Sequence, residues 1–124
     1  MNAANLVQWL DSSSRNQWIT IGPFSVYLRK AHRLVLGNGS PTQMHVVDLA
    51  SVNNETNGLV RTGQLPQLLS VLEAFVAHRG FDGLYVENVL VDFLYPMLLR
   101  AGYVHVPSYT NGASCFFKQL NNRS

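Results

Sequence analysis

The chain has 124 residues, of which 47% are hydrophobic and 13% are charged. This length fits one domain, and the apolar content is sufficient for a buried core, which excludes wholesale disorder and collagen-like or coiled-coil structures. Nine Lys and Arg residues against seven Asp and Glu give a net charge of +2, an excess too small to indicate nucleic-acid or membrane binding by itself.

The first half of the chain is predicted to be rich in strands. Apolar residues recur with helical spacing only near the start, and the later runs favour β-structure, with turn residues such as Gly22 and Pro23 between them. The expected elements are a helix over Ala3–Leu10, strands over Trp18–Ile21 and Phe24–Arg29, a strand over Arg33–Leu36 that continues the preceding one or pairs with it, a loop over Gly37–Pro41, and a strand over His45–Val52.

The second half alternates between helices and strands. Six apolar residues between Leu65 and His78 fall on one helical face, and Gly80 is a suitable helix terminator. The elements expected here are a loop over Asn53–Thr62, helices over Leu65–His78 and Phe93–Arg100, and strands over Gly83–Val86, Tyr103–Val106 and Ser114–Lys118. Together these elements predict an α+β (mixed α/β) fold. We expect one domain over 1–124, with a short N-terminal helical segment, 1–17, and a core, 18–118.

The junction between the strand ending at Val52 and the helix from Leu65 is a candidate anion site. Free backbone N–H groups at a helix start bind phosphate or pyrophosphate, Gly63 permits close approach of a ligand, and Arg61 could add a charged hydrogen bond. The alternative is that Gly63 serves only as an ordinary loop glycine, and Pro66 removes one N–H from the first turn.

An ordered set of segments resembles the GNAT (Gcn5-related N-acetyltransferase) superfamily, in particular small GNAT-like proteins carried by bacteriophages. The matching segments are 22–29, 47–52, 61–64, 68–75, 84–89 and 98–103, and the resemblance spans roughly residues 18 to 118. It implies a central mixed, mostly antiparallel sheet with helices packed on it. It also implies transfer of an acyl group from acetyl-coenzyme A to an amine of a protein or small molecule.

The same resemblance implies a set of site residues. The cofactor-binding positions are Val52, Asn53, Arg61, Thr62, Gly63, Gln64, Leu65 and Asn88. The candidate catalytic residues are Glu87, Glu55 and Tyr95, with His45 as a further candidate base. A solvated loop acid is the alternative for Glu55, and a cap on the following turn is the alternative for Glu87. No metal is expected, because the four histidines lack ligand spacing.

Several positions depart from the GNAT pattern. Val60, Leu65, Val91 and Leu98 are apolar where the superfamily has small or polar residues. The alternative function is therefore a catalytically degenerate GNAT-fold protein that binds and modulates a host macromolecule. The expected partners are acetyl-coenzyme A with an amine acceptor, or a host protein; a homodimer is left open, and neither a membrane nor a nucleic acid is expected.

Two remaining features concern compartment and charge. The chain shows no signal peptide and no apolar stretch near the roughly 20 residues of a membrane helix, and the single Cys115 excludes an internal disulfide. We expect the cytoplasm, or the host cytoplasm for a phage protein. The basic cluster of Arg29, Lys30, His32 and Arg33 is interpreted as a solvated strand edge that discourages aggregation, with nucleic-acid binding as the alternative.

Overall fold

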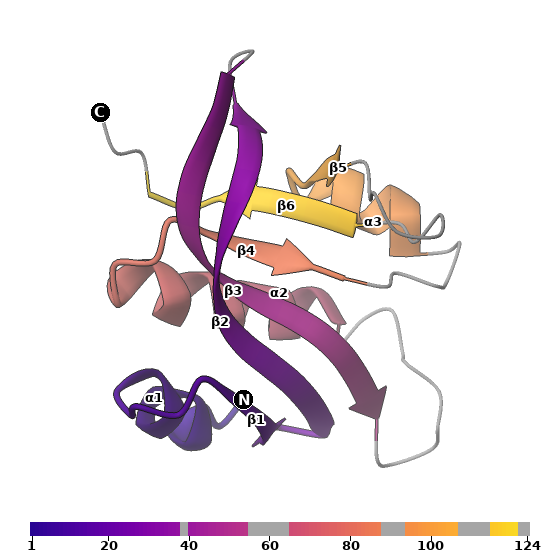
Figure 1. Cartoon of the computed structure of the whole chain (residues 1–124). Coiled ribbons are helices and arrows are strands. Elements are labelled where there is room, and N and C mark those ends of the chain that lie inside the picture. The colour runs from indigo at the N-terminus through magenta and orange to yellow at the C-terminus, as the bar shows by residue number, and fades with distance from the viewer. Residues whose placement is uncertain (38–39, 55–64, 88–93, 107–114, 122–124) are drawn as a thin grey trace.

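A single mixed sheet organises the described part of the chain (Figure 1). The computed structural model describes residues 1–37, 40–54, 65–87, 94–106 and 115–121. The elements within these ranges are α1 (Ala4–Leu10), β1 (Asn16–Ile21), β2 (Phe24–Gly37), β3 (Ser40–Asn54), α2 (Leu65–His78), β4 (Gly83–Val86), α3 (Leu94–Arg100), β5 (Val104–Val106) and β6 (Cys115–Gln119). None of the helices described in these ranges is long and apolar enough to cross a bilayer.

The six strands are ordered β1-β2-β3-β4-β6-β5. Neighbouring strands are antiparallel except β3 and β4, which are parallel and joined through α2. Connecting two parallel strands requires a crossover of this kind. The structure therefore confirms the predicted α+β class with a mostly antiparallel sheet.

Strand alternation divides the buried side chains between the two faces of the sheet. Val47 and Phe116 belong to the main core, which also receives apolar side chains from α1, α2 and α3. Their sequence neighbours Val46 and Phe117 belong to a smaller cluster that also contains Tyr85. Because successive strand residues point to opposite faces, the helices pack on one face and the smaller cluster lies on the other.

Several sequence predictions are confirmed closely, and the hairpin is the main difference. α2 and β4 have the predicted bounds, and Gly80 ends the helix region at a positive φ of 85°. β2 continues through the predicted 33–36 strand, and the expected loop over 37–41 is shorter, because Gly37 pairs with Ser40. The twisted hairpin of β2 and β3 extends beyond the other strands (Figure 1). Cross-strand pairing thus outweighs the turn preference of this Gly- and Pro-containing segment.

Gly83 allows β4 to approach β6 closely. A Cβ at this position would lie 2.6 Å from the carbonyl oxygen of Lys118 and 2.5 Å from Cε1 of Phe117. We expect Gly83→Ala to lower the free energy of unfolding by about 1–3 kcal/mol, because the carbonyl belongs to a paired strand and cannot move freely. Urea unfolding measures this loss, with Ser70→Ala on the exposed side of α2 as the control. Equal stability of the two variants would contradict the close approach.

Candidate functional site

A basic groove lies beside β2 at the point where β1 stops pairing with it. β1 begins at Asn16, opposite Arg29, and the Lys30 N–H donates to Arg15 O at 2.8 Å, so β2 continues from Ala31 without a described partner strand on this side. The groove has a volume of about 550 Å³. The basic residues that line the groove are Arg15, Arg29, Lys30, His32, Arg33 and His45. Asp48 is the carboxylate among its lining residues.

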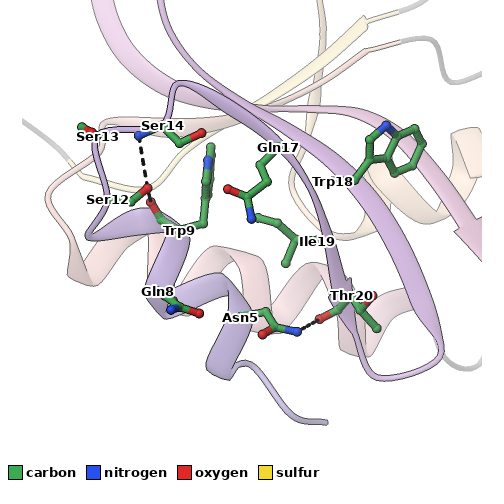
Figure 2. A pocket seen from close by; sticks show the side chains of 10 residues that line it. All are labelled: Asn5, Gln8, Trp9, Ser12, Ser13, Ser14, Gln17, Trp18, Ile19 and Thr20. Carbon is green, nitrogen blue, oxygen red and sulfur yellow. Dashed lines mark hydrogen bonds between the residues drawn. The ribbon is translucent and has the colours of Figure 1, made fainter.

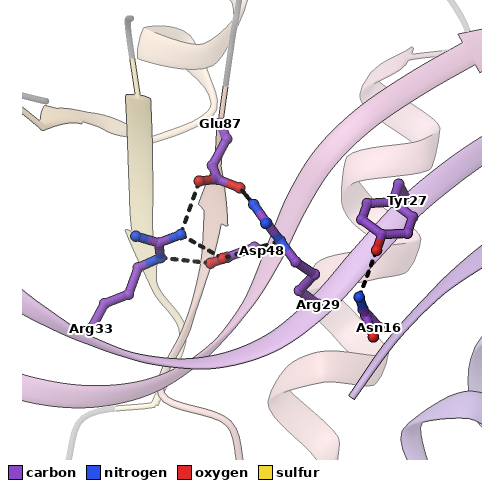
Figure 3. A network of polar contacts seen from close by, with 6 residues as sticks. All are labelled: Asn16, Tyr27, Arg29, Arg33, Asp48 and Glu87. Carbon is purple, nitrogen blue, oxygen red and sulfur yellow. Dashed lines mark hydrogen bonds and ion pairs between the residues drawn. The ribbon is translucent and has the colours of Figure 1, made fainter. Parts of the chain in front are cut away.

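An ion-pair network from three strands forms one wall of this groove (Figure 3). Arg33 of β2 donates to both carboxylate oxygens of Asp48 on β3, with Nε–Oδ1 and Nη2–Oδ2 distances of 2.9 and 2.6 Å. Arg33 also donates to Glu87, just after β4, at 2.9 Å. Arg29 donates to the other oxygen of Glu87, and its Nε lies 3.9 Å from Asp48. The network therefore ties β2, β3 and β4 together.

Burial sets the electrostatics of the network. Asp48 is 1% exposed, and loss of hydration raises the pKa of its carboxyl above the ordinary value despite the opposing hydrogen bond from Arg33. That same hydrogen bond raises the pKa of Arg33 and keeps its guanidinium charged. The Arg33 guanidinium also lies 4.2 Å from the centre of the Tyr85 ring. Two arginines against two carboxylates leave this part of the wall close to neutral.

Two further cations line the groove, Arg15 and Lys30, and neither forms a direct ion pair with a described carboxylate. Lys30 Nζ donates to two uncharged carbonyl oxygens, Trp9 O at 3.0 Å and Ser12 O at 2.7 Å, which fixes the end of α1. Burial lowers the pKa of Lys30. Arg15 is exposed, and its guanidinium pairs with none of the described carboxylates.

Two histidines and a phenylalanine form a stack at the groove. The His32 and His45 rings are 4.4 Å apart and nearly parallel, and His45 lies 4.5 Å from Phe81. The His45 backbone N–H donates to Asp82 Oδ2 at 2.8 Å. Within the part of the chain that the structure describes, no three His, Cys, Asp or Glu side chains are grouped to hold a metal ion.

A second cavity, also about 550 Å³, lies between α1 and β1. Its lining is uncharged, and Figure 2 shows Gln17 and Ile19 directed toward α1 while Trp18 points away from them. The Trp9 indole Nε1 is buried there without a hydrogen-bond partner among the described residues. Because it has no charge, this cavity is less suited than the basic groove to an anionic ligand.

The structure places the sequence-predicted site residues at separate locations. Val52 is half-buried and Asn53 exposed at the end of β3, and Leu65 is buried at the start of α2. Glu87 forms ion pairs with Arg29 and Arg33, and the turn that it was predicted to cap lies outside the described residues.

Tyr95 lies farther across the sheet, where its ring packs edge-on against Phe116 of β6. The predicted positions outside the described residues are Glu55, Arg61, Thr62, Gly63, Gln64 and Asn88. The roles given to all these residues, and binding of acetyl-coenzyme A, stay predictions.

The pairing of β3 with β4 covers only part of β3. It covers Val46–Leu49, and the Glu87 N–H donates to Leu49 O at 2.9 Å. Beyond this point β3 continues to Asn54 alongside β2, and the two parallel strands separate (Figure 1). The separation therefore begins after Leu49.

Sequence reasoning missed the ion-pair network, although one signal was present. Asp48 is a single carboxylate within an apolar strand, and a buried carboxylate requires a charged or hydrogen-bonding partner. Arg29 and Arg33 are an even number of residues apart on β2, so they share a face. The interpretation of the cluster as a solvated edge is wrong for these two arginines, because both are ion-paired and partly buried.

Comparison with known proteins identifies a similar fold. No family model matches the chain, and no curated protein matches it. A chain in the crystal structure of a KacTA–DNA complex matches with a TM-score of 0.59 and 16% sequence identity, over 94% of this chain and 75% of that chain. At this identity the likeness shows a shared fold alone.

These comparisons correct three sequence-based expectations. The GNAT resemblance gains no support, because no family model matches and the matching structure is described as a KacTA–DNA complex. Acyl transfer from acetyl-coenzyme A, and its degenerate GNAT alternative, lose their basis with that resemblance. The expected set of partners, which left out nucleic acid, is contradicted because the structure sharing this fold is a DNA complex.

The ion-pair network predicts that two Asp→Asn variants differ strongly in their free energy of unfolding. Asp48→Asn removes the charge that compensates two partly buried arginines, so we expect the free energy of unfolding to fall by about 2–4 kcal/mol. The control is Asp11→Asn, which breaks an exposed pair with Arg79 and should leave stability essentially unchanged. Urea unfolding followed by circular dichroism measures both, and similar small losses in both variants would contradict the structural role of Asp48.

Proposed function

We propose that the basic groove binds the phosphodiester backbone of a nucleic acid. The observation that carries this proposal is the exposed cation Arg15, which lines the groove and forms no ion pair with any described carboxylate. Lys30 also lines the groove, with its ammonium donating to Trp9 O and Ser12 O. Phosphate oxygens accept hydrogen bonds from such Arg and Lys side chains, and these contacts fix the position of a nucleic acid on a protein.

Other features of the groove support the same ligand class. Ser13 and Asn16 line the groove and can donate to phosphate oxygens. The Arg29 and Arg33 guanidinium groups are held in place by ion pairs with Glu87 and Asp48. Little conformational entropy is therefore lost by these two side chains when a ligand binds. The likeness to a chain of the KacTA–DNA complex adds support from a shared fold.

Arg15→Ala tests the proposal without disturbing the ion-pair network. Fluorescence anisotropy with a labelled oligonucleotide, measured over a series of salt concentrations, gives the affinity and its salt dependence. We expect weaker binding for Arg15→Ala and a salt slope reduced by about 0.7–0.9, because one phosphate contact is lost. The matched control is Arg100→Ala, an exposed arginine on α3.

Two results would contradict the proposal. One is the absence of oligonucleotide binding by the wild-type protein even at low salt. The other is an equal loss of affinity in Arg15→Ala and Arg100→Ala, since a general charge effect would not distinguish the groove from the rest of the surface.

A further inference from the structure

An exposed aromatic pair lies on the sheet next to the basic groove. Trp18 of β1 is 53% exposed, although large aromatic side chains are normally mostly buried. It packs against Tyr27, its direct partner on β2, with ring centres 5.3 Å apart and an angle of 46° between the planes. Tyr27 itself is half-buried.

The strand register makes this aromatic pair continuous with the groove. Asn16 lines the groove and pairs with Arg29, and two residues further along the strands Trp18 pairs with Tyr27. Residues two apart on a strand share a face and are separated by roughly 7 Å. Asn16, Arg29, Trp18 and Tyr27 therefore form one block, which we call the aromatic–basic block.

Two observations show that this block lies on the face away from the helices. Ile19 and Leu28, which directly follow Trp18 and Tyr27 on their strands, are buried in the main core on the helix-covered face. The Trp18 side chain also points away from α1, opposite to that of Gln17 (Figure 2). The aromatic–basic block thus presents the indole ring to solvent beside the groove.

A hydrogen bond orients the tyrosine of the block. Asn16 Nδ2 donates to the Tyr27 hydroxyl at 2.6 Å, which joins a groove residue directly to the aromatic pair (Figure 3). A fixed ring under Trp18 limits the motion of the indole. The exposed face of Trp18 is then pre-arranged for stacking with a flat ligand group, which lowers the entropy cost of binding.

We infer that the groove and the aromatic–basic block bind single-stranded nucleic acid, with a base stacked on Trp18 while the adjoining phosphates contact the groove. This inference rests on the proposed function and names its ligand more closely. Single strands combine backbone charge with unpaired bases that stack on aromatic side chains, whereas the bases of a duplex are stacked on one another and unavailable. A cationic groove with an exposed indole beside it is therefore better suited to a single strand than to a duplex.

Intrinsic fluorescence and affinity test this inference together. Trp9 is 1% exposed and Trp18 is 53% exposed, so a stacked base should quench mainly Trp18. With a short oligodeoxythymidine strand we expect quenching in the wild type that is lost in Trp18→Phe. We expect Trp18→Ala to bind this strand at least about five-fold more weakly, and Trp18→Phe to retain most of the affinity because a ring remains.

Binding to heparin and a control variant distinguish base stacking on Trp18 from the binding of phosphates in the groove. Heparin carries charge but no bases, so Trp18→Ala should be retained on a heparin column like the wild type. Tyr95→Ala removes another exposed aromatic side chain, on α3, and should leave the affinity for the strand unchanged. Normal affinity of Trp18→Ala for the strand, or absence of quenching, with heparin retention intact would overturn the base-stacking inference alone. Absence of binding to both heparin and the strand at low salt would overturn both proposals.

Discussion

The desolvated carboxylate of Asp48 is the constraint around which the open face of the sheet is arranged. A buried carboxylate is costly unless charged donors surround it, and here the donors come from the neighbouring strand β2. Glu87 then bridges Arg33 and Arg29 from beyond β4. The three central strands are thereby fixed in a register that a shift of one residue would break, because Arg33 and Asp48 would move to opposite faces.

This arrangement separates the positively charged side chains that are ion-paired within the protein from those that form no direct ion pair with a described carboxylate. Arg29 and Arg33 form a wall that is nearly neutral, whereas Lys30 points to the other side of the same strand and contacts carbonyl oxygens at the end of α1. Arg15 precedes β1 and is free of carboxylate contacts within the described ranges. Because β1 begins only at Asn16, these cations border a groove instead of a continuous sheet. In the proposed function, the access of a phosphate to these cations therefore depends on where β1 begins.

Local patterns predicted those parts of the fold that local forces determine. The bounds of α2 and the position of β4 follow from apolar periodicity and from the glycines that flank them. The length of the β2–β3 hairpin could not be predicted from local patterns. Pairing between residues distant in the sequence extends both strands through residues of low β-propensity. The groove also depends on register between strands, and its Asp48 was visible in the sequence only as an isolated charge in an apolar run. The GNAT resemblance depended on the order of short apolar segments, which many mixed sheets share.

A direct test of the central claim is a nuclear magnetic resonance titration of the isotope-labelled protein with a short oligonucleotide. If the groove binds the phosphate backbone, the Nε–H signal of Arg15 and the backbone amides of Asn16, Lys30 and Ala31 should shift progressively as ligand is added. The signals of Arg100 and Val104, on α3 and β5, should remain in place. Shifts confined to α3 and β5, with none around Arg15, would contradict the account.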